Sequence, residues 1–211
     1  MSASNAGRIG VWGASGSGKS ALVKGLLRSR KRVIVFDPLD EYSKEGFTRV
    51  KISEAARTEM IRDWSGFRVA LVPQAGYEAR YLNQISKLLI AAQEPFRKDG
   101  SKLGATFAVE EMNLSFPVRG GASRAPAFAD ICSRGRHYGI EVFGLSQRIA
   151  EVDMRFRGNC TETYVLRQQG GRDVEAASVV TGATKQRVSG IKNLQYLHEK
   201  NGEIIEGVVK F

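Results

Sequence analysis

The sequence predicts an α/β fold in which a mostly parallel central sheet carries helices on both faces. Short apolar runs typical of buried strands alternate with longer amphipathic segments typical of helices, which is the pattern of repeated βαβ units. A glycine-rich segment at residues 13–18 separates the first predicted strand from the first predicted helix. The 211 residues, of which 42% are hydrophobic, suffice for one complete core. We therefore expect a single domain over residues 1–211.

Each predicted element rests on its own apolar pattern. Residues 33–36 are continuously apolar and are followed by Asp37-Pro38, as in a strand buried on both faces. Residues 78–94 place their apolar side chains on one helical stripe, and Pro95 ends or kinks that helix. Asn201-Gly202 lies between two apolar runs and predicts a C-terminal β-hairpin over residues 196–211. The other predicted strands are 8–12, 67–72, 106–109, 141–145 and 162–166, and the other predicted helices are 19–28, 127–136, 173–180 and 185–191.

Composition and charge narrow the class of protein. No apolar run approaches the roughly 18 residues that cross a bilayer, and the N-terminus lacks the apolar centre of a secretory signal. We therefore expect a soluble protein with no transmembrane segment of its own. Cys132 and Cys160 have no neighbouring Cys or His at metal-ligand spacing, so we expect reduced thiols. The formal charge of +10 suits a polyanionic partner, although a solubilising surface explains it almost as well.

The glycine-rich segment has the composition of a phosphate-binding loop. Glycines lack a Cβ, so the backbone can adopt left-handed angles and turn its N–H groups inward around a phosphate. The lysine and serine that open the next helix supply a charge for the β- and γ-phosphates and a hydroxyl ligand for Mg²⁺. The alternative is a glycine turn without a ligand. We expect ATP and Mg²⁺ to bind here, with Ser20 as a metal ligand, and the loop consists of Gly13, Ala14, Ser15, Gly16, Ser17, Gly18, Lys19 and Ser20.

Two acids follow the predicted strand at residues 106–109. Successive strand side chains point to opposite faces, so Glu110 and Glu111 are expected to have different roles. We assign Glu110 to the Mg²⁺ shell and Glu111 to orienting and deprotonating the attacking water. The exchanged assignment and an ordinary surface pair of acids are the alternatives.

Four motifs in order resemble those of the FtsK/HerA superfamily of hexameric nucleic-acid pumps. Besides the loop and the acids, they are Asp-Pro-Leu-Asp-Glu-Tyr at residues 37–42 and the segment 134–148, which ends in Ser-Gln-Arg. We expect this chain to be a small single-domain member without a membrane anchor. Within the superfamily, such members resemble the genome-packaging ATPases of tailless, membrane-containing icosahedral viruses. The resemblance implies a RecA-like core, a homo-oligomeric ring, with a hexamer favoured, and a nucleotide between neighbouring subunits. Glu110 stands where the superfamily usually has Asp, which is a departure from its pattern.

Three further residues are assigned to catalysis. Gln147 ends a predicted strand, where its amide can bond the γ-phosphate or the attacking water, although a loop-starting polar residue is the alternative. Arg136 is the candidate that crosses a subunit interface to a neighbour's γ-phosphate, with Arg134 as a second candidate and surface arginines as the alternative. Asp37 lies at a strand's carboxyl end, beside the expected Mg²⁺ water, although Asp-Pro is also a common turn. For Glu41 and Tyr42, structural and functional roles are equally expected.

Residues 113–126 mix Gly, Pro and Arg without periodicity, which predicts a mobile loop. Because this segment follows the two acids directly, we expect Arg119 and Arg124 to grip DNA phosphates, with a surface loop of incidental charge as the alternative. Phosphate contacts predict salt-sensitive binding that does not depend on DNA sequence.

The expected function is an ATP-hydrolysing double-stranded DNA translocase that packages a viral genome into a preformed capsid. The partners would be double-stranded DNA and a capsid vertex or viral membrane protein, and the location the host cytoplasm or the virion. Two other readings use the same loop. A small-molecule phosphotransferase would not need a water-orienting acid, and a nucleotide-dependent docking protein would hydrolyse ATP slowly.

Overall fold

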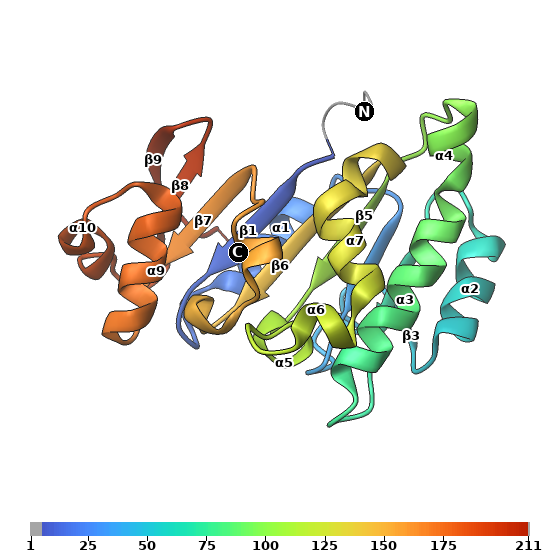
Figure 1. The fold of residues 1–211 in the computed structure, drawn as a ribbon, viewed down its shortest axis with the longest axis horizontal. Coiled ribbons are helices and arrows are strands. Elements are labelled where there is room, and N and C mark those ends of the chain that lie inside the picture. Colours follow the sequence, from blue (N-terminus) through green and yellow to red (C-terminus); the bar gives the residue numbers. More distant parts are fainter. Residues whose placement is uncertain (1–5, 211) are drawn as a thin grey trace.

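A computed structural model describes residues 6–210 of the chain, and its strands form one twisted sheet (Figure 1). The spatial order of the strands is β3-β4-β2-β5-β6-β1-β7-β8-β9. The strands from β3 to β7 run parallel, and only the last two join antiparallel to their neighbours. The strands are β1 (Arg8–Trp12), β2 (Val33–Phe36), β3 (Thr48–Val50), β4 (Arg68–Leu71), β5 (Ala105–Val109), β6 (Ile140–Ser146), β7 (Glu162–Leu166), β8 (Gln195–Lys200) and β9 (Glu203–Val208).

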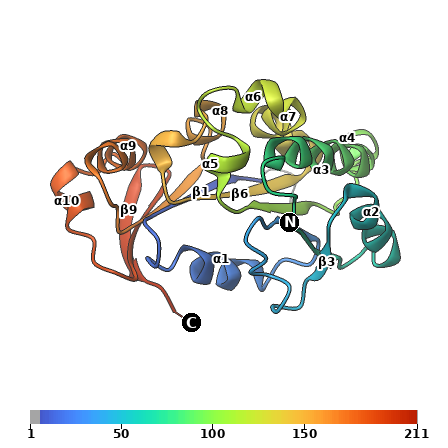
Figure 2. The same ribbon diagram turned by 90° about the horizontal axis from the view of Figure 1, so that it is seen from below.

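Helices cover both faces of the sheet, as predicted. Figure 2 shows α1 beneath the sheet, with α3, α7, α8 and α9 on the opposite face. The helices are α1 (Lys19–Leu27), α2 (Ser53–Arg62), α3 (Glu78–Ala92), α4 (Glu94–Asp99), α5 (Met112–Ser115), α6 (Gly121–Arg124), α7 (Pro126–Arg134), α8 (Met154–Arg157), α9 (Gly171–Thr181) and α10 (Lys185–Ser189). Among the described residues, no helix is both long and apolar enough to cross a membrane.

The core consists of two apolar clusters, one on each face of the sheet. Alternate strand residues point to opposite faces. Ile34 and Phe36 therefore join the cluster between the sheet and helices α3 and α7, while Val33 and Val35 join the cluster between the sheet and α1. All four side chains of β2 are buried. This burial on both faces explains why the central strands are continuously apolar in the sequence.

The strand order determines which chain segments meet at the carboxyl edge of the sheet. β6 lies between β1 and β5, and β7 lies on the other side of β1. The glycine loop therefore has the residues after β5 and β6 on one side and those after β7 on the other. Ligands of open parallel sheets bind at such carboxyl edges.

The predicted hairpin is confirmed with a small shift in its start, from residue 196 to Gln195. Asn201 and Gly202 both have positive φ, at 54° and 83°, as a two-residue primed turn requires. Phe211 of the predicted hairpin lies outside the described residues. Pro95 also acts as predicted, since α3 ends at Ala92 and a new helix, α4, contains the proline in its first turn.

The prediction of an irregular loop at residues 113–126 is wrong. This segment contains the end of α5, all of α6 and the first residue of α7. Phe116 is fully buried and lies edge-on to Phe128, with ring centroids 5.0 Å apart. Gly121 packs so closely on Phe116 that an added Cβ would be 2.8 Å from its carbonyl carbon. These contacts order a segment whose Gly and Pro content predicted irregular structure.

Candidate active site

The glycine loop connects β1 to α1 in the conformation of a phosphate-binding nest. Gly16 and Gly18 have φ values of +69° and +101°, which side-chain-bearing residues rarely adopt. Lys19 Nζ donates to the carbonyl oxygen of Ala14 at 3.2 Å, within the loop. Within residues 6–210, the N–H groups of Gly16, Gly18, Lys19 and Ser20 have no protein acceptor. Donors left open at a helix N-terminus suit an anion.

Lys19 is largely buried between this loop and three carboxylates. Burial lowers the pKa of its ammonium group, while Glu111, Glu110 and Glu41 act in the opposite direction. The lysine is therefore a buried cation whose nearby acids belong to the segments after β5 and β2. A phosphate bound on the open N–H groups would meet this charge as well.

Glu110 and Glu111 point to different partners, as their positions after β5 predicted. The carboxylate of Glu110 is buried and accepts a hydrogen bond from Tyr42 Oη at 2.6 Å. Burial is the main reason that the pKa of Glu110 rises to about 7, and the Tyr42 hydrogen bond acts against that rise. Glu111 has a left-handed backbone, with φ +42°, and accepts a hydrogen bond from Gln147 Nε2 at 2.8 Å. Strained backbone at non-glycine residues often occurs at functional sites.

Asp37 organises the turn that brings Tyr42 to Glu110. Its Oδ1 accepts from the backbone N–H of Glu41 at 3.0 Å, and its Oδ2 accepts from that of Tyr42 at 2.9 Å. Burial is the main cause of a raised pKa for the Asp37 carboxyl, and these two hydrogen bonds oppose it. Both oxygens thus bond the backbone of the turn, and the catalytic assignment of Asp37 stays a prediction.

Residues at the end of β6 contact both the segment after β5 and the start of α9. Gln147 bonds Glu111, while the neighbouring Ser146 hydroxyl donates to Asn113 Oδ1 at 2.8 Å. Arg148 forms an ion pair with the buried carboxylate of Asp173 at the start of α9. Chemically, the amide of Gln147 can hold the Glu111 carboxylate in place for proton transfer from a water.

Two residues beyond β7 were missed from the sequence: Arg167 contacts the glycine loop, and Gln168 contacts the end of β1 just before it. Arg167 Nη2 donates to the carbonyl oxygen of Ser15 at 3.2 Å, and Gln168 Nε2 donates to that of Trp12 at 3.0 Å. In the sequence, the only indication of a role was their position at the carboxyl end of a predicted strand. This position places them beside the glycine loop because β7 pairs with β1, which the sequence did not predict.

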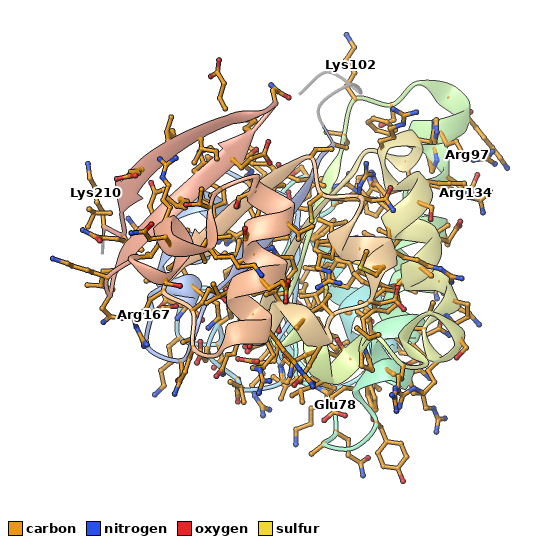
Figure 3. The ribbon with its side chains drawn as sticks, turned by 60° about the vertical axis from the view of Figure 1, so that its left-hand side comes forward. Glu78, Arg97, Lys102, Arg134, Arg167 and Lys210 are labelled. Atoms are coloured by element: carbon orange, nitrogen blue, oxygen red, sulfur yellow. The ribbon has the colours of Figure 1, made fainter. Side chains whose placement is uncertain are left out.

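The predicted arginines do not lie at this site. Arg134 and Arg136 precede β6, at the opposite edge of the sheet, and seven strand residues span roughly 20 Å. Figure 3 shows Arg134 and Arg167 on opposite sides of the molecule. Arg134 pairs with Asp130 on its own helix. Arg124 is exposed and its guanidinium donates to the carbonyl oxygens of Gly120 and Arg119.

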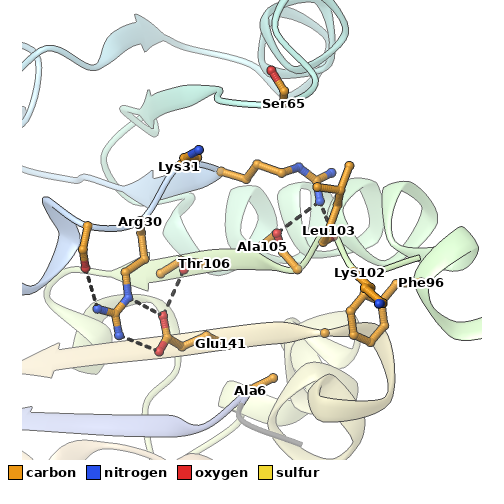
Figure 4. A pocket seen from close by; sticks show the side chains of 14 residues that line it. Ala6, Arg30, Lys31, Ser65, Phe96, Lys102, Leu103, Ala105, Thr106 and Glu141 are labelled. Carbon is orange, nitrogen blue, oxygen red and sulfur yellow. Dashed lines mark hydrogen bonds and ion pairs between the residues drawn. The ribbon is translucent and has the colours of Figure 1, made fainter. Parts of the chain in front are cut away.

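A pocket of about 270 Å³ lies at the amino ends of the strands, away from the glycine loop (Figure 4). In it, Glu141 accepts from Arg30 and from the Thr106 hydroxyl. Arg32, which precedes β2, is buried and stacks on Trp64 at 4.4 Å. The hollow is therefore not the site of the predicted phosphate chemistry.

The residues at the glycine loop fit a magnesium ion held mainly by phosphate. Within residues 6–210, no group of three His, Cys, Asp or Glu side chains is arranged to bind a metal by itself. Mg²⁺ is usually held by one or two protein oxygens together with substrate phosphates and water. The Ser20 hydroxyl and the Glu110 carboxylate would hold it, and this assignment stays a prediction.

The fold and the loop define a P-loop NTPase class of protein. The family model described as Helicase HerA, central domain, matches residues 6–92. A search of curated proteins finds no match. This match agrees with the predicted resemblance to the FtsK/HerA ATPases over residues 6–92.

Three solved structures have a similar fold. The genome packaging NTPase B204 from Sulfolobus turreted icosahedral virus 2, in complex with AMPPCP, superposes with a TM-score of 0.73 at 14% identity, covering 97% of both chains. B204 from Sulfolobus turreted icosahedral virus, described as a DNA-packaging ATPase, has a TM-score of 0.67 at 18% identity and covers 96% of both chains. VirB4 of Thermoanaerobacter pseudethanolicus has a TM-score of 0.69 at 14% identity, covering 97% of this chain and 89% of VirB4. At these identities, the structures support the fold.

Proposed function

We propose that this protein hydrolyses ATP to translocate double-stranded DNA, and that it packages a viral genome into a preformed capsid. The observation that carries the proposal is the Gln147–Glu111 hydrogen bond at the carboxyl edge, beside the glycine loop. A phosphotransferase needs no base for water, whereas this carboxylate is positioned and held by an amide. The fold shared with the B204 packaging NTPases supports the packaging part of the proposal.

The residues divide the work as follows. The open N–H groups of the loop and Lys19 bind the phosphates of ATP, and Glu111 takes the proton of the attacking water. When bound, Mg²⁺ neutralises phosphate charge and is held by Ser20 and Glu110. Gln147 keeps Glu111 oriented.

Arg136 lies too far from its own loop to act there, so we place it at a neighbour's nucleotide in a homo-oligomeric ring, with a hexamer favoured. Because the ring's channel would carry DNA, we propose that Arg119 and Arg124 contact phosphates along it. Such binding weakens steeply as salt rises. The protein would dock on a capsid vertex or a viral membrane protein, in the host cytoplasm or the virion.

ATPase assays with and without double-stranded DNA test the proposal. The parent protein should be strongly stimulated by DNA of any sequence. Glu111→Gln should lower kcat by about a hundredfold or more while ATP binding is retained. Unchanged hydrolysis in Glu111→Gln would remove the proposed base.

Two outcomes would overturn the DNA part. Phosphate transfer from ATP to a metabolite would indicate a phosphotransferase. Slow hydrolysis that is indifferent to DNA would indicate a docking protein.

A further inference from the structure

The sheet order predicts the direction in which a bound nucleotide lies across the glycine loop. The hydrolytic groups follow β5 and β6, which lie on one side of β1, so the γ-phosphate faces that side. The base and ribose must then extend to the other side of β1. That side holds β7 and the C-terminal hairpin.

We propose that Leu194 and Arg167 form the wall that receives the base and ribose of the nucleotide, with the buried Val209 supporting Leu194. The ligand class is a nucleoside di- or triphosphate, whose flat base would pack on the partly exposed Leu194 side chain. The proposal rests on the nucleotide-binding part of the proposed function and not on DNA transport.

The two ends of the hairpin contact the glycine loop directly. A Cβ built on Gly18 would be 3.0 Å from Leu194 Cδ2 and 3.2 Å from Val209 Cγ2. The N–H of Val209 donates to the carbonyl oxygen of Leu194 at 2.8 Å, which ties the two ends together. Val209 is buried, although its neighbour Val208 is 58% exposed. The hairpin therefore places one apolar pair at the start of α1, where the phosphates bind.

Leu194 holds an unusual backbone conformation at this contact. Its φ is +64°, in the left-handed region that leucine rarely occupies. Asparagine tolerates that region better, and Asn193 stands one position earlier. A leucine kept in a strained conformation, with its side chain against the loop, points to a function for that side chain.

Arg167 supplies a polar group to the same wall. Its Nη2 donates to Ser15 of the loop, and its Nε donates to Asn193 Oδ1 at 3.4 Å. Within the described part of the chain, its Nη1 has no hydrogen-bond partner. The guanidinium therefore links the loop to the residue before Leu194 and retains donors for a ribose hydroxyl or an α-phosphate.

The test compares binding of ADP with binding of inorganic tripolyphosphate, which has no base or ribose. Leu194→Gly removes the side chain and accepts the positive φ, so the protein should remain folded. It should bind ADP about tenfold more weakly and tripolyphosphate with less than about a twofold change. Leu194→Asn, which also tolerates this φ, should behave in the same way. Ile205→Ala is the control, because it shortens an exposed aliphatic side chain on the same hairpin.

Parent-like affinity of Leu194→Gly for ADP would overturn the proposal, as would an equal loss for both ligands. A parent protein that binds neither ligand would overturn the phosphate-loop assignment and this proposal with it. A protein that binds ADP through this wall but ignores DNA would contradict the translocase and leave the wall confirmed.

Discussion

Among single residues, Glu110 combines an ionisable carboxyl with a nearly closed environment. Its side chain lies beneath the segment that connects Asp37 to Tyr42, and burial favours its neutral form. Tyr42 donates to one oxygen and so favours the ionised form. Burial is the larger effect, and the net result is a pKa of about 7 instead of 4.5.

This shift predicts the pH dependence of stability in protein free of metal and nucleotide. The folded pKa is raised, so the neutral carboxyl stabilises the folded state fully below pH 4.5, and this contribution is lost as pH rises through about 7. The loss amounts to about 3 kcal/mol. Glu110→Gln should remove this dependence while its amide oxygen still accepts from Tyr42.

Urea unfolding at pH 5 and pH 8, with a chelator present, measures the effect. The free energy of unfolding of the parent, relative to that of Glu110→Gln, should be lower at pH 8 than at pH 5. Equal pH slopes for the two proteins would contradict the raised pKa.

Among the elements, β6 is the strand that carries Gln147 between the glycine loop and the acids. Gly144 in this strand lets Phe156 and Met112 approach closely, since an added Cβ would lie 2.3 Å from Phe156 Cε1 and 2.5 Å from Met112 Cε. A glycine inside a buried strand often marks such a close approach.

Gly144→Ala should therefore destabilise the protein by about 1–3 kcal/mol through overpacking. It should also lower ATP hydrolysis, because the shift needed to admit the methyl group moves the strand that ends in Gln147. Thermal unfolding and steady-state hydrolysis measure the two effects.

Gly25→Ala is the control: Gly25 is an exposed position in α1 where an added Cβ meets nothing within 4 Å. That change should stabilise the protein by about 0.5–1 kcal/mol. A Gly144→Ala protein as stable as the control would show that the contacts yield freely.

The sequence predicted those elements whose apolar residues form a period, and it missed those that lack one. The predicted bounds of the strands Arg8–Trp12, Val33–Phe36 and Glu162–Leu166 match the structure. β3 was missed because it has three residues and only Val50 is buried. α2 was missed because it buries only Ala56 and Met60, which make no apolar stripe.

The site shows a similar division. The loop and the two acids are local patterns, so they could be recognised one segment at a time. Arg167 could not, because its contact with Ser15 depends on β7 being paired with β1, more than 150 residues away along the chain. The link between Tyr42 and Glu110 depends likewise on β2 lying beside β5.

On the scale of the whole molecule, the proposed hydrolytic residues lie at the two opposite edges of the sheet. The carboxyl edge holds the glycine loop and the acids, and the amino edge holds Arg134 and Arg136. Within residues 6–210, the Arg136 side chain forms no ion pair or hydrogen bond with the protein, whereas Arg134 is paired with Asp130. A head-to-tail ring would bring one edge to the other at every interface.

Mixing of inactive subunits tests this arrangement. Lys19→Ala removes phosphate binding but keeps Arg136, and Arg136→Ala does the reverse, so each should be nearly inactive alone. In an equal mixture, about a quarter of interfaces combine an intact loop with an intact arginine from the neighbour, and hydrolysis should recover to about that fraction of the parent rate.

The matched control mixes Lys19→Ala with Glu111→Gln, whose defects lie in the same subunit's site, and should show no recovery. An Arg136→Ala protein that assembles and hydrolyses ATP at the parent rate would exclude this arginine. Recovery with Arg134→Ala in its place would assign the role to Arg134.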